Sequence, residues 1–87
     1  MREIVLDGNE MKTKVEMHDY LKNSFLLPYY YARNLDSLYQ ILVKETDPMK
    51  VTMINKESIS LGYGDALVLL FHDLCAENHN YSFELKD

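Results

Sequence analysis

The sequence contains little cysteine, proline or glycine: one, two and three residues out of 87, and it has no tryptophan. A single cysteine cannot form an internal disulfide, which argues against a disulfide-stapled secreted domain and fits a reducing compartment. Three glycines leave little backbone to cradle a phosphate group, and no glycine-rich phosphate loop or Walker motif occurs. We therefore expect no disulfide framework, no nucleotide cofactor and no enzyme activity.

Long hydrophobic runs are missing as well. No stretch approaches the ~20 apolar residues that a helix needs to cross a bilayer. Residues 2–6 alternate polar and apolar before becoming apolar, which predicts a strand and not the apolar core of a signal peptide. We expect a cytoplasmic protein that makes no contact with a membrane.

Basic residues are scarce relative to acidic ones. Nine Lys and Arg face fourteen Asp and Glu, so the formal net charge is −5. Direct binding to nucleic acid depends on neutralising phosphates with cations, and this balance argues against it. A net negative charge instead favours encounter with a basic partner. Because 47% of the residues are hydrophobic, we expect one compact domain over residues 1–87.

Periodicity predicts an α/β fold. Alternation and β-branched residues indicate strands, whereas capping residues and apolar spacings of three or four indicate helices. The order of elements requires crossover connections, which predict a small three-stranded parallel sheet packed with three to four helices. The expected elements are a strand at 2–6, a helix after Thr13 ending near Leu26, a helix after Asn34, a strand at 50–55, a helical turn within 56–61, a flexible hinge at 62–64, a helix at 66–78 capped by Asp65, and a strand at 81–85.

The apolar spacing also predicts which helix faces are buried. His18 lies beside the first apolar stripe and is expected to be partly exposed. The expected core positions are Met17, Leu21 and Phe25 in the first helix, Leu35, Leu38, Ile41 and Leu42 in the second, and Leu67, Leu70, Phe71 and Leu74 in the third.

Three consecutive tyrosines, Tyr29 to Tyr31, occupy a predicted loop between Pro28 and Asn34. Loops usually carry small polar residues, so large aromatic residues there have two explanations. They can close over the core, or they can form an interface, for which tyrosine is favoured. Adjacent side chains cannot all share one direction, so we expect at least one tyrosine to be buried and at least one to be exposed.

The helix that follows presents Asp36, Tyr39 and Gln40 at positions i, i+3 and i+4. This spacing predicts that the three side chains share one helix face, opposite the leucine stripe. Such a face is either an ordinary solvated surface or a binding surface, and the spacing alone favours the solvated surface.

The segment from Leu27 to Tyr39 carries the pattern Leu-Pro-x-Tyr-Tyr-x-x-Asn-Leu-Asp-x-Leu-aromatic. This pattern resembles the signature of the barstar family, intracellular inhibitors of barnase-type ribonucleases. The order of the predicted elements is similar to that family over nearly the whole chain. The resemblance implies a barstar-like fold and a ribonuclease with a basic active site as the protein partner.

The resemblance also implies which residues bind that partner. In the family, an acidic helix face and the preceding loop plug the active site of the nuclease, and carboxylates mimic substrate phosphates. Tyr31 is then expected to pack inward. The positions that match family contacts are Tyr30, Ala32, Arg33, Asn34, Leu35, Asp36, Tyr39, Gln40 and Asp73.

Three of these positions depart from the family pattern. Gln40 stands where the family has a carboxylate, Arg33 where it often has an acidic residue, and Ala32 where it often has glycine. An amide cannot pair with a guanidinium as a carboxylate does. The departures favour a less basic or differently shaped nuclease, with a barstar-like domain for a non-nuclease partner as the alternative.

A third interpretation comes from His72, Cys75 and His79, which fall at i, i+3 and i+7 on one helical stripe. This spacing could ligate zinc or support a thiol-dependent enzyme. Leu74 and Phe71 crowd the region, however, and no fourth ligand is evident. We expect no metal site, no other cofactor and no catalytic residue.

Overall fold

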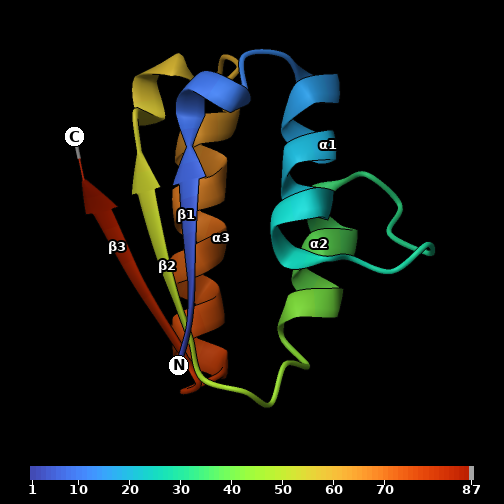
Figure 1. Cartoon of the computed structure of the whole chain (residues 1–87), viewed down its shortest axis with the longest axis vertical. Coiled ribbons are helices and arrows are strands. Elements are labelled where there is room, and N and C mark those ends of the chain that lie inside the picture. The colour runs from blue at the N-terminus through green and yellow to red at the C-terminus, as the bar shows by residue number, and fades with distance from the viewer. Residues whose placement is uncertain (87) are drawn as a thin grey trace.

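The computed structural model describes residues 1–86, and it contains one sheet of three parallel strands in the order β1-β2-β3 (Figure 1). In the register of the sheet, Ile4 lies beside Val51, which lies beside Phe83. The predicted α/β fold with a parallel sheet is confirmed. The elements are β1 (Arg2–Asp7), the 3₁₀ turn η1 (Gly8–Glu10), α1 (Lys14–Phe25), α2 (Leu35–Leu42), β2 (Met49–Ile54), the 3₁₀ turn η2 (Lys56–Ser58), α3 (Tyr63–Glu77) and β3 (Tyr81–Lys86).

The helices pack against one face of the sheet, and the core lies between the two. Leu6, Val51 and Met53 point to this face and are fully buried. Figure 1 shows α3 running along the strands and α1 lying beside β1. On the opposite face, alternate strand residues such as Glu3 and Glu84 are exposed. Apolar residues therefore alternate with polar ones along the strands, as a sheet covered on one side requires.

The predicted apolar stripes of all three helices face this core, although Leu35 and Ile41 of α2 are only half-buried. In α1, Met17, Leu21 and Phe25 are buried, and the stripe of α3 is buried in full. In the core, the Phe71 ring stacks on Phe25 and on Phe83, with ring centroids 6.0 Å and 5.3 Å apart. These aromatic contacts join α1, α3 and β3. They therefore fix which faces of α1 and α3 point away from the core.

A side chain from α1 also holds the free edge of β1. The Tyr20 hydroxyl accepts a hydrogen bond from the Asp7 backbone N–H at 3.0 Å and donates one to the Val5 carbonyl at 3.1 Å. An edge strand otherwise leaves such groups unpaired. Tyr20 therefore ties α1 to the sheet.

The starts of α1 and α2 follow the predicted capping. Thr13 Oγ1 accepts a hydrogen bond from the Glu16 N–H at 3.1 Å, and Asn34 Oδ1 accepts one from the Ser37 N–H at 2.7 Å. These bonds satisfy donors that the first turn of a helix leaves free. α1 ends at Phe25, where the predicted stop near residue 26 is confirmed.

The predicted start of α3 was wrong. Asp65 does not cap this helix, because the helix begins at Tyr63, three residues before the predicted first residue, and its cap is Gly62, with φ of 85°. Glycine tolerates this left-handed conformation better than other residues do. Residues 62–64 are therefore a helix start and not a flexible hinge. Asp65 lies in the first helical turn, and its Oδ1 lies 2.6 Å from Lys56 Nζ.

Within residues 1–86, every helix is too short or too polar to cross a membrane.

Candidate functional site

A groove between α2 and α3 brings together four of the residues predicted to bind a partner. Its volume is about 300 Å³. Asp36 comes from the first turn of α2 and Asp73 from α3, so the two carboxylates lie at one hollow although 37 positions separate them in the sequence. This α2–α3 groove is lined by Leu35, Asp36, Tyr39, Ala66, Leu69, Leu70 and Asp73.

Tyr39 is the aromatic element of the α2–α3 groove. It is half-buried and packs against the core, so the expectation that it lies opposite the leucine stripe was wrong: it borders that stripe. Desolvation raises the pKa of its hydroxyl, and the negative charges of Glu77 and Asp73 raise it further. The ring therefore lies within electrostatic reach of the acidic side chains of α3.

Gln40 is exposed on α2 but is not among the residues that line the groove. It belongs to the next turn after Asp36, so it is placed to touch a partner that extends beyond the groove.

Leu69 and Ala66 also line the groove from α3, and neither is among the residues predicted to bind a partner. Leu69 is 62% exposed, an unusual position for a leucine in the middle of the most apolar helix of the chain. Two features of the sequence indicate this position of Leu69. It falls outside the predicted core stripe, and it lies four residues before Asp73, hence on the same helix face. Leu69 therefore adds apolar surface to the groove beside the carboxylate of Asp73.

The tyrosine loop, defined here as residues 28–34, projects from the molecule beside α1 and α2 (Figure 1). Tyr29 is 93% exposed and Tyr30 is 64% exposed, whereas Tyr31 is only 6% exposed. This distribution confirms that the tyrosines divide between the surface and the core and that Tyr31 packs inward. The rings of Tyr29 and Tyr30 meet edge to face, with centroids 5.6 Å apart.

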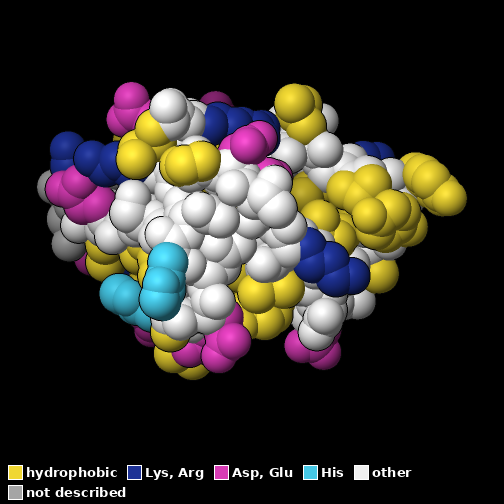
Figure 2. Space-filling model, turned by 90° about the horizontal axis from the view of Figure 1, so that it is seen from below, with side chains coloured by type: hydrophobic (Ala, Val, Ile, Leu, Met, Phe, Trp, Pro, Cys, Tyr) yellow, Lys and Arg dark blue, Asp and Glu magenta, His cyan; other side chains and the backbone are white. Residues whose placement is uncertain are grey.

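Exposed hydrophobic side chains gather at the end of the molecule that carries this loop. Leu26, Tyr29 and Tyr30 are all exposed there. Figure 2 shows such a group of hydrophobic atoms at the right-hand end, the side to which the loop projects in Figure 1. A patch of this kind in a small acidic protein indicates a protein-binding surface.

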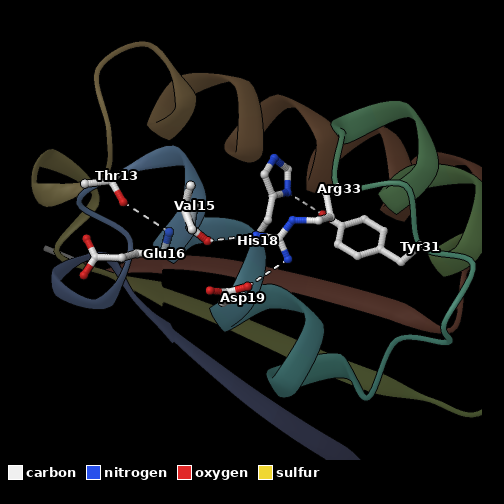
Figure 3. A network of polar contacts seen from close by, with 7 residues as sticks. All are labelled: Thr13, Val15, Glu16, His18, Asp19, Tyr31 and Arg33. Atoms are coloured by element: carbon white, nitrogen blue, oxygen red, sulfur yellow. Dashed lines mark hydrogen bonds and ion pairs between the residues drawn. The ribbon is translucent and has the colours of Figure 1, made fainter.

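His18 anchors the buried tyrosine of the loop. It is 2% exposed, so the prediction of a partly exposed histidine was wrong. The reason is a polar contact that apolar spacing cannot reveal: His18 Nδ1 and the Tyr31 hydroxyl share a hydrogen bond of 2.6 Å (Figure 3). Burial raises the pKa of Tyr31 to about 12, although the nearby Arg33 opposes the shift. The hydroxyl therefore stays protonated and available for this bond.

The remaining predicted loop residues have distinct positions. Arg33 reaches back to α1, where its Nη1 lies 2.8 Å from Asp19 Oδ1. Ala32 is exposed, and its N–H donates to Ser37 Oγ at 2.9 Å. Because Asn34 caps α2, the loop leads directly into the acidic first turn of the helix.

The other end of α2 is held from the start of β3 and from Asn78, the C-cap of α3. The Tyr81 hydroxyl donates a hydrogen bond of 2.8 Å to the carbonyl of Leu42, and Asn78 Nδ2 donates to the carbonyls of Val43 and Glu45 at 3.0 Å and 2.7 Å. Carbonyls at a helix C-terminus lack partners within the helix. These bonds fix α2, and with it Asp36 and Tyr39, against the rest of the fold.

His72, Cys75 and His79 do not form a metal-binding cluster: within the described chain, no group of three or more His, Cys, Asp or Glu residues could hold an ion. His72 instead packs edge-on against Phe83, with ring centroids 5.5 Å apart. Burial raises the pKa of the Cys75 thiol, which disfavours the thiolate that metal binding or nucleophilic attack requires.

A small parallel α/β protein that exposes an aromatic loop next to an acidic groove has the features of a domain that binds another protein. The sequence matches the model of the family described as Barstar (barnase inhibitor) over residues 1–76. The chain therefore belongs to the barstar family, as the pattern at 27–39 indicated.

The chain is also similar to a curated protein of Bacillus subtilis (strain 168) named "Putative ribonuclease inhibitor YrdF". The two are 38% identical over 58 residues. The aligned segment covers 66% of this chain and 64% of that protein, which is less than two thirds of the relative's length.

Proposed function

We propose that this protein inhibits a ribonuclease by binding and occluding its active site, using the tyrosine loop and the α2–α3 groove as one surface. The observation that carries the proposal is the convergence of Asp36 and Asp73 from two helices at a groove that contains Tyr39. A ribonuclease active site must bind phosphate, so it presents cations that complement such carboxylates. Family membership and the relative's printed name support the same assignment.

The groove suits a basic side chain of the partner. A guanidinium or ammonium group would pair with Asp36 and Asp73, while its aliphatic part would pack on Leu35 and Leu69. The Tyr39 ring offers an additional face to a cation. The carboxylates, the leucines and the Tyr39 ring each bind a different part of an Arg or Lys side chain. Together they favour a partner whose cleft carries such side chains.

The tyrosine loop supplies packing area beside this charged contact. Tyr30 is exposed and has few rotatable bonds, so ordering it on binding costs little entropy. Asn34 anchors the loop to the helix through its cap. An interface of standard size would bury about 800 Å² on each partner, and the loop and groove together would form its centre.

We further propose that the protein acts in the cytoplasm as one domain over residues 1–87, without enzyme activity and without binding nucleic acid directly. Its net charge of −5 supports attraction to a basic protein and opposes binding to RNA. Gln40 supplies no charge at an exposed position of α2, so the preferred nuclease has a less basic cleft than a partner of an acidic family member.

An inhibition assay tests the proposal. Barnase and the ribonucleases encoded near this chain's gene would each be mixed with increasing amounts of the purified protein, and RNA cleavage would be followed. We expect one of them to lose activity at a one-to-one ratio. The double variant Asp36→Asn/Asp73→Asn should restore cleavage at the same concentrations.

Unchanged cleavage by every nuclease of the panel would contradict the proposed function. Equal inhibition by the wild type and the double variant would contradict the role of the groove. Binding of a non-nuclease protein through the same residues would assign this surface to a different partner.

A further inference from the structure

Arg33 is a cation at the junction of the tyrosine loop and the acidic start of α2, yet its charge is directed to α1. Its Nη1 lies 2.8 Å from Asp19 Oδ1, and its Nη2 donates to the Val15 carbonyl at 3.3 Å (Figure 3). Among residues 1–86, no ion pair joins Arg33 to Asp36 or Asp73.

The backbone of Arg33 is also unusual, because its φ is 56°. A residue with a Cβ rarely adopts this left-handed conformation unless its surroundings hold it there. The neighbours supply such restraints. The side chain is held on α1, the preceding Ala32 N–H donates to Ser37 Oγ, and the following Asn34 caps α2.

We propose that Arg33 is a positioning residue that holds the tyrosine loop on α1 in the conformation that binds the partner, and that it does not contact the partner's cations. The inference rests on the proposed function, since it assigns the loop to the binding surface. Arg33 and Asp19 form the outer attachment, while Tyr31 and His18 form the buried one. Together they fix the direction of Tyr30, which lies between Tyr31 and the exposed Tyr29.

This role explains how a cation is compatible with a surface built for a basic target. Asp19 neutralises Arg33 locally, so the carboxylates of the groove keep their attraction for cations. A free arginine at this position would instead repel the partner. The two roles make opposite predictions for a variant in which Arg33 is replaced by an anion. A positioning role predicts weaker binding to the partner, whereas a repulsive contact predicts tighter binding.

The first experiment uses the free protein and needs no nuclease. Amide exchange would be measured by NMR at Tyr31 and Ala32, whose N–H groups bond to the Pro28 carbonyl and to Ser37 Oγ. In Arg33→Asp we expect both amides to exchange about two- to fivefold faster, the range that a surface ion pair supports. The Asp19 and Arg33 side chains are 58% and 42% exposed, so the midpoint of global unfolding should hardly move.

Two further variants isolate the ion pair. Lys12→Asp makes the same change in net charge at an exposed residue ahead of α1, and it should leave the loop amides unchanged. The swapped pair Asp19→Arg/Arg33→Asp restores opposite charges and should return exchange toward the wild-type rate. Unchanged exchange in Arg33→Asp would overturn the proposal, and so would fast exchange that the swap does not slow.

The second experiment measures binding to the ribonuclease that the inhibition assay identifies. Arg33→Asp should bind more weakly than Lys12→Asp despite equal net charge, and the swapped pair should recover affinity. Tighter binding of Arg33→Asp than of Lys12→Asp would make Arg33 a repulsive contact and overturn the proposal. If no ribonuclease binds any variant but the exchange pattern holds, the positioning of the loop is supported and the proposed function alone is overturned.

Discussion

The tyrosine loop and the α2–α3 groove are neighbours in one proposed surface, but different forces hold them in place. The groove residues sit on helices whose buried leucines, such as Leu38 and Leu74, pack in the core, and uncharged hydrogen bonds from Tyr81 and Asn78 add to the hold on α2. The loop depends on polar pairs with α1, between Tyr31 and His18 and between Arg33 and Asp19. Apolar packing carries no charge to titrate or to screen, whereas charged and titratable pairs respond to pH and to salt screening. We therefore expect the groove to keep its structure when pH or salt changes, and the loop to respond to both.

The largest effect should come from the packing beneath the groove. Leu38 is fully buried on the inner side of α2. Replacing it by alanine leaves a cavity, and the free energy of unfolding should fall by about 2–5 kcal/mol in urea denaturation. Leu69→Ala is the matched control, because this leucine is mostly exposed and its loss should change stability by less than about 0.5 kcal/mol. Equal losses of unfolding free energy in the two variants would contradict the view that Leu38 holds α2 in place beneath the groove.

The next effect concerns the charge in the groove. Asp36→Asn keeps the shape of the side chain but removes its charge, and a bond between charged groups contributes about 1.5–3 kcal/mol. Affinity for the ribonuclease should fall about ten- to a hundredfold in calorimetry, and the salt dependence of the association rate should become weaker. Asp47→Asn removes the same charge from an exposed residue outside the groove and should have little effect. A similar loss in both variants would mean that net charge, and not the groove, drives binding.

Acidification should weaken the loop side of the comparison. Desolvation lowers the pKa of His18 below its usual value of 6.5, the positive charges of Arg33 and Lys14 lower it further, and Asp19 opposes them. Protonation would also add a second N–H to a buried ring whose Nε2 has no partner within the described residues. The unfolded state therefore takes up this proton first, and stability falls as the pH drops below about 6.5.

His18→Gln tests this pH dependence. At pH 7.5 the variant should be less stable by about 1 kcal/mol, because the buried bond to Tyr31 is weakened. The difference from the wild type should shrink between pH 7 and pH 5, since glutamine has no proton to gain. Parallel pH profiles in denaturant titrations would show that His18 does not titrate differently in the folded and unfolded states.

The smallest effect should come from Gln40, which is exposed one turn beyond Asp36. Gln40→Asp adds a carboxylate next to the groove, and affinity for a basic ribonuclease should rise about two- to fivefold, as for an exposed ion pair. Gln40→Glu should act in the same direction. A loss of affinity in both variants would show that the partner is not basic at this point.

The groove itself was not predicted, and Asp73 was named only from the family resemblance, but periodicity did predict the helix faces that border the groove. The apolar stripes of α2 and α3 were identified from their spacing, and burying them leaves Asp36 and Asp73 on outer faces that meet where the helices pack. The Asn34 cap was also predictable, because it is a local interaction across three residues. What spacing did not reveal was that Tyr39 borders the core and that Leu69 stays exposed, because both depend on how far apart the two helices pack.

The attachment of the loop could not be predicted. His18 looked like a residue beside an apolar stripe, and its burial depends on Tyr31, thirteen positions away. The bond between Arg33 and Asp19 likewise needs a left-handed backbone that an arginine does not prefer. The early start of α3 at Tyr63 has a similar cause, since the left-handed Gly62 replaced a side-chain cap. In each case a tertiary contact or a backbone conformation decided the structure, and the pattern of neighbouring residues in the sequence did not.

The most direct test of the account is the hydrogen-exchange footprint of the complex between this protein and the ribonuclease that the inhibition assay identifies. If the loop and groove form one surface, binding should slow exchange in residues 28–40 and 66–73 together. The strands, whose outer face carries Glu3 and Glu84, should keep the exchange rates of the free protein. Protection confined to the sheet face, or to the loop without the groove, would contradict the central claim.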